Sequence, residues 1–345
     1  MSRFCKILFL SAVTAIHLDL AVCAETETEG APAYDKTVPL IGWDRYSGDS
    51  ASSAKEWGRW WKYLRLKKPV VMKWMDDLVL RIYPGNEICR ALFVRGIYNP
   101  NVAVVISKLL PSGGTFIDVG ANMGYVSLLA SKVVGREGRI FALEPSSRDF
   151  ARLSDNVAIN NLNQVISPRR LAICEKNGTA HLIISSEERN ALNTLGSEIS
   201  CKGVEKETTE EVETSTLDAF VEGEGGKIAR IDVIQLDIEG SEVKALLGAR
   251  NAIEKYRPAL IISANRSALK SCNTDCGELQ KTIDEMGYRV YRMAEEPVFA
   301  LELVSDLSQT KPGIIVCLHK SSEVPVLPQP EEFSILTRIS RFFSR

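Results

Sequence analysis

The feature that most constrains the fold is the segment from residue 115 to residue 144, where a glycine-containing turn follows a short apolar run. Residues 115–119 and 139–143 are rich in β-branched and aromatic side chains, as is typical of buried strands, and residues 125–134 between them favour a helix. Gly120 and Gly124 separate the first strand from the helix, and Glu144 ends the second strand. This order predicts a β-α-β unit of a doubly wound α/β sheet.

The turn of this unit predicts a binding site for an adenosyl cofactor. In doubly wound sheets, ligands lie outside the carboxyl ends of the strands, and Gly120 and Gly124 let the backbone approach a ligand closely. Asp118 and Asn122 offer polar groups for the amino-acid part of such a cofactor, and Glu144 can accept hydrogen bonds from ribose hydroxyls. The spacing lacks the middle glycine of pyrophosphate-binding turns, which argues against a nicotinamide-dependent oxidoreductase. A purely structural glycine turn is the alternative.

The alternation of strands and helices continues through the rest of the chain. Further strands are expected at residues 165–173, 233–236 and 259–263, and further helices at residues 146–160, 241–254 and 277–286. Residues 288–293 and 313–318 are expected to form an antiparallel pair at one edge. We therefore predict a Rossmann-like, doubly wound and mostly parallel seven-stranded sheet with an antiparallel edge strand, formed by residues 111–320.

Five segments make the chain resemble methyltransferases of the FkbM family. They are Gly96-Ile-Tyr-Asn-Pro, residues 116–131, residues 141–145, Val212-Glu-Thr-Ser-Thr-Leu-Asp218 and residues 234–242, of which the last two are the most distinctive. The resemblance covers roughly residues 75–295. It implies a class I methyltransferase fold, S-adenosylmethionine as the methyl donor, and a hydroxyl of a sugar, polyketide or similar small metabolite as the acceptor.

Two carboxylates, Asp237 and Glu239, follow the fourth expected strand. Methyl transfer requires the protein to hold the acceptor oxygen in line and to exclude water, and a hydroxyl acceptor benefits from a base. We therefore predict that Asp237 is the base or the group that orients the acceptor, and that Glu239 holds the substrate or the cofactor. The alternative is that the two carboxylates cap the helix expected to begin near Ser241.

Three positions depart from the family pattern. Asn99 stands where the family has an acidic residue, Gln235 where it has lysine, and Ser263 where it often has glutamate. Each difference is expected to remove a charge near the acceptor. The differences fit either another acceptor or weakened catalysis, so a noncatalytic binding or scaffold protein on a methyltransferase fold is the alternative to an active enzyme.

The first 24 residues have the pattern of a secretory signal peptide. Arg3 and Lys6 precede a short apolar stretch, and Val22-Cys23-Ala24 forms a small-residue cleavage site. We therefore expect an extracytoplasmic protein or one of the secretory pathway, with a cytoplasmic location as the alternative if the segment is not a true signal. Export would require a compartment to which a transporter supplies S-adenosylmethionine.

Three further segments flank the expected methyltransferase domain. Residues 25–54 are polar and predict a flexible linker. Residues 55–110 predict an N-terminal extension of helices and strands, in which Trp57, Trp60 and Trp61 either pack on the core or form a basic aromatic surface for an acidic glycan or membrane. Residues 321–345 predict a proline-containing connector and an amphipathic C-terminal helix, which either docks on the body or makes peripheral contact with a membrane.

Composition narrows the choice of partners. The chain has 42 basic and 44 acidic residues and a formal net charge of −2, which argues against a nucleic-acid partner. Cys272 and Cys276 have no second cysteine pair nearby and histidines are few, so no metal site is expected. In an exported protein these two cysteines could pair with each other or with Cys201.

Overall fold

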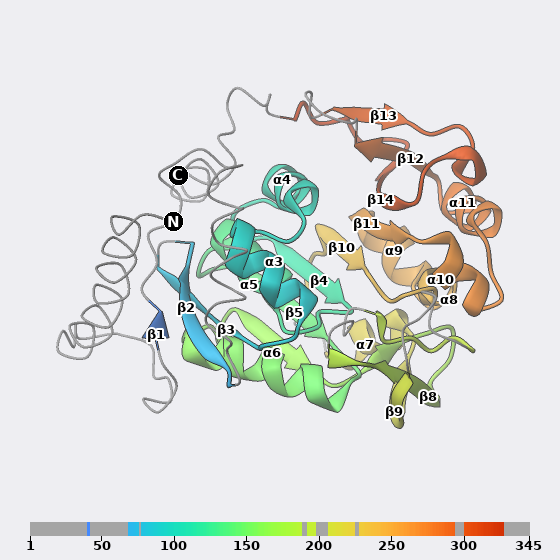
Figure 1. Cartoon of the computed structure of the whole chain (residues 1–345). Helices are drawn as coiled ribbons and strands as arrows, with labels where there is room; N and C mark the ends of the chain where they lie inside the picture. Colours follow the sequence, from blue (N-terminus) through green and yellow to red (C-terminus); the bar gives the residue numbers. More distant parts are fainter. Residues whose placement is uncertain are drawn as a thin grey trace, which may run out of the picture.

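The centre of the protein is an eight-stranded sheet with helices on both of its faces (Figure 1). The computed structural model describes residues 40–41 and 68–327, apart from residues 76, 188–191, 198–205, 225–227 and 294–299. In sheet order the strands are β13 (Leu301–Leu303), β12 (Tyr288–Met293), β14 (Gly313–His319), β11 (Ala259–Ala264), β10 (Val233–Leu236), β4 (Thr115–Val119), β5 (Arg139–Leu143) and β6 (Ile166–Arg169). The expected signal peptide, the tryptophan-rich start of the N-terminal extension and the C-terminal helix lie outside the described residues. So does most of the expected linker, although two of its residues, Leu40–Ile41, are described and form a strand, β1.

The sheet is doubly wound and mostly parallel, which confirms the predicted fold class. Strands β6, β5, β4, β10 and β11 run parallel to one another. The expected antiparallel pairing of β12 with β14 is also present, but β14 lies between β11 and β12 instead of at the edge. The edge is formed by β13, an eighth strand that pairs antiparallel with β12 and whose three residues are too few to leave a pattern in the sequence.

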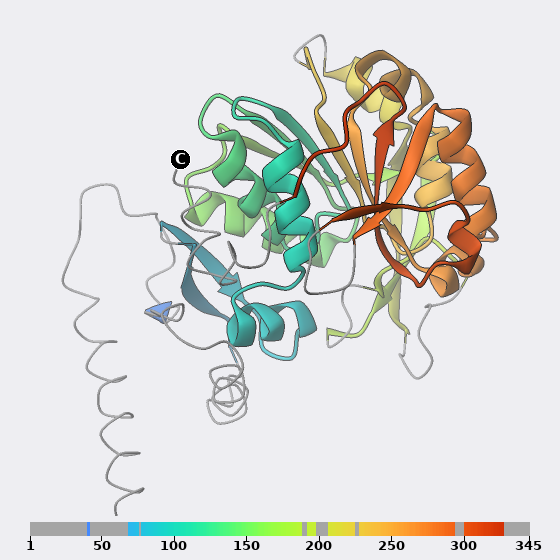
Figure 2. The same ribbon diagram turned by 90° about the horizontal axis from the view of Figure 1, so that it is seen from above.

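Each face of the sheet packs against its own layer of helices, as Figure 2 shows from above. One layer contains α3 (Glu87–Arg95), α4 (Pro100–Leu109), α5 (Tyr125–Val134) and α6 (Ser147–Ile159). The other contains α7 (Leu217–Gly223), α8 (Glu242–Leu247), α9 (Arg250–Tyr256), α10 (Arg266–Ser271) and α11 (Cys276–Glu285). Successive side chains of β4 point to opposite faces of the sheet, so Phe116 packs in the first core and Ile117 in the second.

The N-terminal extension shares the core of the first layer. It begins with a hairpin of β2 (Val70–Trp74) and β3 (Leu78–Ile82) and continues into α3 and α4, and β1 (Leu40–Ile41) from the preceding segment pairs with β2. The Trp74 side chain is buried in that core and its indole N–H donates to the Gly96 carbonyl at 2.6 Å. The side chains of Asn156 and Asn160 accept hydrogen bonds from the β3 backbone, which fixes the hairpin on α6.

Two predicted elements are each divided in two by tertiary contacts. The expected strand at residues 165–173 becomes β6 in the main sheet and β7 (Ala172–Ile173) in a second sheet with β8 (Gly178–Ser185) and β9 (Lys206–Ser215). The expected helix at residues 241–254 becomes α8 and α9, with Gly248 between them. A side chain at Gly248 would lie 2.2 Å from the Cys174 carbonyl oxygen, so this break is where the chain passes close to β7.

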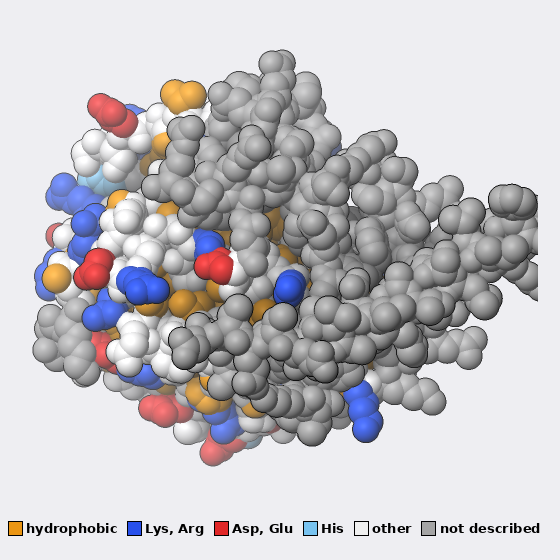
Figure 3. Space-filling view, turned by 90° about the vertical axis from the view of Figure 1, so that its left-hand side faces the viewer, with side chains coloured by type: hydrophobic (Ala, Val, Ile, Leu, Met, Phe, Trp, Pro, Cys, Tyr) orange, Lys and Arg blue, Asp and Glu red, His pale blue; other side chains and the backbone are white. Residues whose placement is uncertain are grey.

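The surface carries charges of both signs. Figure 3 shows acidic and basic side chains interspersed with hydrophobic ones on the described part of one face. Within the described ranges, no helix combines the length and the apolar character needed to cross a membrane. Cys272 and Cys276 are buried free thiols, so the expected local pairing between them is not formed, and Cys201 lies outside the described residues.

Candidate functional site

A cavity of about 520 Å³ lies at the carboxyl ends of the parallel strands. Because these strands all end at the same edge of the sheet, their following loops converge there. The cavity is lined by five of the residues predicted from the sequence, namely Gly120, Asn122, Glu144, Asp237 and Glu239. The structure thus brings the expected cofactor turn and the expected acceptor carboxylates into one space.

Gly120 makes the closest approach between the cofactor turn and the end of β10. Its φ of +86° lies in the left-handed region, and a side chain there would place its Cβ 2.1 Å from the carbonyl oxygen of Asp237. The N–H groups of Gly120 and Ala121 both donate to the Leu143 carbonyl, at 2.9 and 3.0 Å. Glycine is therefore required for the turn to lie against both neighbouring strands.

Glu144 holds the turn from the end of β5. Its Oε2 accepts a hydrogen bond from the Asn122 N–H at 2.8 Å, and its Oε1 accepts one from the Ser146 N–H at 2.9 Å. Burial, and after it the neighbouring Asp149 carboxylate, raise the pKa of Glu144 to about 8, although these hydrogen bonds act to lower it. Carboxylate oxygens have additional lone pairs, so Glu144 can still accept hydrogen bonds from a ligand in the cavity.

Asp118 and Gly124 lie behind the cavity wall. The Asp118 side chain is fully buried, its Oδ2 accepts a hydrogen bond from Ser127 Oγ at 2.6 Å, and burial raises its pKa to about 7. Gly124 precedes α5 with a φ of +86°, and a Cβ there would lie 2.6 Å from Leu153 Cδ1. The structure therefore places these two predicted residues where they support the turn and the packing of α5 on α6.

Asp237 faces the cavity from the end of β10, next to Ser263 of β11. Burial raises the pKa of Asp237, and a hydrogen bond with the Ser263 side chain opposes this shift. Both residues line the cavity. Ser263, which stands where the family often has glutamate, is thus a hydrogen-bonding partner of the predicted base Asp237.

The loop after Asp237 is held by a residue that sequence reasoning missed. Glu242 is 1% exposed and accepts hydrogen bonds from the N–H groups of Ile238, at 3.2 Å, and Gly240, at 3.0 Å. The N-cap residue of α8 is Ser241, and its side chain makes no capping hydrogen bond. Glu239 has a left-handed φ of +46°, and the N–H groups on either side of it are bound by Glu242.

The other two departures from the family pattern have different locations. Asn99 lines the cavity and caps α4, since its side chain accepts a hydrogen bond from the Val102 N–H at 3.5 Å. Gln235 is buried inside β10, in register with Asp118 of β4, and is not among the described residues that line the cavity. Gln235 is therefore held away from the cavity wall, because strand alternation directs its side chain, like that of Val233, toward the first helix layer.

Loops supply further lining residues that the sequence did not single out. They include Asn193, Leu195 and Lys311, and the strand β12 adds Arg292. Leu171, Ala172, Ile173 and Leu182 add an apolar wall where the second sheet meets the cavity. These residues carry no local pattern that marks them as site residues, because their place in the cavity depends on how distant loops pack together.

The strand order, with an antiparallel strand inserted beside β11, defines a Rossmann-like class I methyltransferase fold. The family model described as the methyltransferase FkbM domain matches residues 118–290, which is half of the chain. The protein therefore belongs to the FkbM methyltransferase family. The match includes the Gly120 turn, Glu144 and the segment around Asp237.

Similar proteins include curated and structurally characterised methyltransferases. The hexuronic acid methyltransferase AglP of Haloferax volcanii is 29% identical over 147 residues, covering 42% of this chain and 53% of the relative, so the match spans about half of that protein. The FkbM methyltransferase of Methylobacillus flagellatus is 18% identical with a TM-score of 0.38, covering 60% of this chain and 44% of that one. An O-methyltransferase of Bacillus cereus in complex with SAH is 14% identical, with a TM-score of 0.34 and coverages of 64% and 78%.

Proposed function

We propose that this protein is an S-adenosylmethionine-dependent methyltransferase that methylates a hydroxyl of a sugar, glycan or other small metabolite. The observation that carries the proposal is the single cavity shared by the Gly120 turn, Glu144 and Asp237. Membership of the FkbM family supports methyl transfer. The similarity to a protein named as a hexuronic acid methyltransferase supports a sugar acceptor.

The residues of the cavity suit the cofactor. Glu144 would accept hydrogen bonds from the ribose hydroxyls, and Leu171 and Leu182 would offer apolar surface to the adenine ring. Gly120 and Asn122 would leave the amino-acid part close to backbone atoms of the turn. Bound there, S-adenosylmethionine supplies an electrophilic methyl group on a sulfonium.

Asp237 is the proposed base. Its raised pKa makes its carboxylate a stronger base than an exposed aspartate, and proton removal activates a hydroxyl acceptor. Ser263 would hold the carboxylate in one orientation. The close packing of Gly120 on the Asp237 backbone keeps this base next to the cofactor turn.

The proposal is tested by measuring cofactor binding and turnover separately. Calorimetry with S-adenosylmethionine and S-adenosylhomocysteine is expected to show binding by the wild-type protein and by Asp237→Asn. Release of S-adenosylhomocysteine on a panel of neutral sugars, uronic acids and glycans is expected for the wild type and to fall by roughly 100-fold or more in Asp237→Asn, the size of a general-base contribution. Asp77→Asn, at the exposed β2–β3 turn, is the matched control and should retain activity.

Two results would contradict the proposal. Absence of binding to either form of the cofactor would remove the basis for methyl transfer. Cofactor binding without turnover on any acceptor of the panel would favour the alternative of a noncatalytic binding protein, which Asn99 and Ser263 suggested from the sequence. Turnover that survives Asp237→Asn would assign the base elsewhere.

We also propose that the chain is exported through its first 24 residues. The support for this is the sequence pattern alone, a basic start, a short apolar stretch and a small-residue cleavage site. Cell fractionation and N-terminal sequencing of the mature chain test it. A mature chain that still begins at Met1 and stays in the cytoplasm would contradict it.

A further inference from the structure

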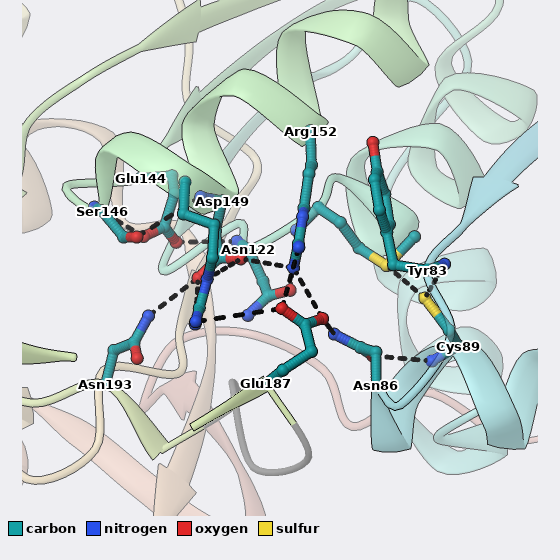
Figure 4. A network of polar contacts seen from close by, with 12 residues as sticks. Tyr83, Asn86, Cys89, Asn122, Glu144, Ser146, Asp149, Arg152, Glu187 and Asn193 are labelled. Carbon is teal, nitrogen blue, oxygen red and sulfur yellow. Dashed lines mark hydrogen bonds and ion pairs between the residues drawn. The ribbon is translucent and has the colours of Figure 1, made fainter. Parts of the chain in front are cut away.

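A partly buried ionic cluster lies beside the cofactor side of the cavity (Figure 4). We call it the clamp and define it as Asn86, Asp149, Arg152, Glu187 and Asn193. Its centre is Asp149, in the first turn of α6, whose side chain is fully buried. The Asp149 carboxylate pairs with Arg152 Nη1 at 3.3 Å and accepts a hydrogen bond from Asn193 Nδ2 at 2.8 Å. The clamp thus joins α6 to the segment around Asn193.

Arg152 connects three parts of the chain. Its Nη1 and Nη2 donate to the two carboxylate oxygens of Glu187, at 2.9 and 2.8 Å, and its guanidinium lies 4.1 Å from the centre of the Tyr83 ring. Glu187 also accepts a hydrogen bond at 3.3 Å from Asn86, the N-cap residue of α3. Arg152 therefore ties α6, the N-terminal extension and the chain just after β8 to one another.

Asn193 belongs both to the clamp and to the wall of the cavity. Its Oδ1 accepts hydrogen bonds from the N–H and Oγ of Ser185, both at 3.0 Å. The next residue, Thr194, forms a bridge with Ile183 and donates from Oγ1 to the Glu239 carbonyl at 2.7 Å. Asn193 and Leu195 line the cavity, so one strip of chain runs from the clamp to the loop that follows Asp237.

Arg152 shares the charges of the clamp with Arg148, whose guanidinium lies 3.3 Å from Asp149 and 3.9 Å from Glu187. The Arg152 side chain is 14% exposed, against 0% for Asp149 and 32% for Glu187. Bidentate arginine–carboxylate pairs are among the strongest hydrogen-bonded contacts, and removal of one partner leaves the other charge buried without compensation. Loss of Arg152 would therefore leave the two carboxylates to Arg148 alone, remove the bidentate contact with Glu187 and loosen the strip that Asn193 begins.

We propose that the Arg152–Glu187 pair is a positioning element that holds the wall formed by residues 193–195 and so sets the affinity of the site for its adenosyl cofactor. This inference rests on the proposed function. Arg152 and Glu187 are not among the described residues that line the cavity, so their effect passes through Asn193 and the strip that follows it. Cofactor affinity and the order of the wall should change together when the pair is broken.

The test uses the full chain and two independent readouts. Calorimetry with S-adenosylhomocysteine is expected to give a Kd raised about tenfold in Arg152→Met and in Glu187→Gln, with little further loss in the double variant, since the two residues act as a unit. Arg152→Lys keeps the positive charge but cannot form the bidentate contact, so its Kd should lie between those of the wild type and Arg152→Met. Hydrogen exchange without cofactor is expected to be faster at residues 192–195 in Arg152→Met.

Arg250→Met is the matched control. It removes an arginine that pairs with Glu285 at 3.5 Å on the surface, where the two side chains are 47% and 48% exposed. This variant should leave the Kd and the exchange of residues 192–195 unchanged. If Arg152→Met fails to fold, Glu187→Gln provides the same test. This variant is expected to fold because the substitution keeps the size of a side chain that is partly exposed.

The outcomes separate this inference from the proposed function. Wild-type protein that binds no S-adenosylhomocysteine would overturn the proposed function, and hydrogen exchange would still decide whether the clamp holds the wall. Wild-type binding together with unchanged Kd values and unchanged exchange in the variants would overturn the clamp. Faster exchange with an unchanged Kd would also overturn it, because the wall would then not control affinity.

Discussion

Gly120→Ala is expected to destabilise the protein and to abolish cofactor binding. The added Cβ would lie 2.1 Å from the carbonyl oxygen and 2.9 Å from the carbonyl carbon of Asp237. Both contacts are with backbone atoms, and the Asp237 N–H is hydrogen-bonded to the Val119 carbonyl at 3.0 Å. β4 and β10 cannot move apart without breaking this hydrogen bond, so the turn at Gly120 itself must shift.

The expected cost has two parts. A non-glycine residue at a φ of +86° costs about 1–2 kcal/mol because of the left-handed backbone. Crowding in a well-packed site costs about 1–3 kcal/mol more. The total is about 2–5 kcal/mol, a large share of the roughly 5–15 kcal/mol that stabilises an ordinary domain.

Gly113→Ala separates the two parts. Gly113 has a φ of +71°, and a Cβ there would meet nothing within 4 Å, so this variant carries the backbone cost alone. Urea unfolding followed by circular dichroism should show Gly120→Ala to be less stable than Gly113→Ala by about 1–3 kcal/mol. Calorimetry should show S-adenosylhomocysteine binding by Gly113→Ala and none by Gly120→Ala. Equal stability of the two variants would refute the argument from close packing.

Two pH-dependent predictions follow from the buried carboxylates. The pKa of Asp118 is about 7 in the folded protein against an ordinary value of 3.8, so the folded state keeps the proton longer and the free energy of unfolding falls as the pH rises between these values. Asp118→Asn should flatten this decline in urea titrations from pH 4 to pH 8, and an unchanged slope would contradict it. Ser263→Ala removes a hydrogen bond that lowers the pKa of Asp237, so the acidic limb of the pH–rate profile should move to higher pH. A shift to lower pH would count against Asp237 as the base.

The predicted strands and helices that match the structure best are those that are mostly buried. The bounds expected for β4, β5, β10, α5 and β12 agree with the structure residue for residue. Four of these elements are strands with neighbours on both sides in the sheet, and β4 and β10 are buried along their whole length, as apolar runs predict. By contrast, β9 has the sequence Lys-Glu-Thr-Thr-Glu-Glu-Val-Glu-Thr-Ser and was not predicted, because one face of this hairpin is solvated and few of its side chains are apolar.

The sequence by itself determined the turn at Gly120, the acidic end of β5 at Glu144 and the carboxylates after β10. Each of these features depends on a few consecutive residues at the end of a strand. The tertiary structure alone decided which of them face the cavity. It placed Asp118 and Gly124 behind the wall, paired Ser263 with Asp237 and buried Gln235 under the first helix layer. It also brought Asn193 and the clamp to the cavity. These outcomes depend on contacts between loops and strands that are distant in the sequence, and the local hydrophobic pattern does not specify such contacts.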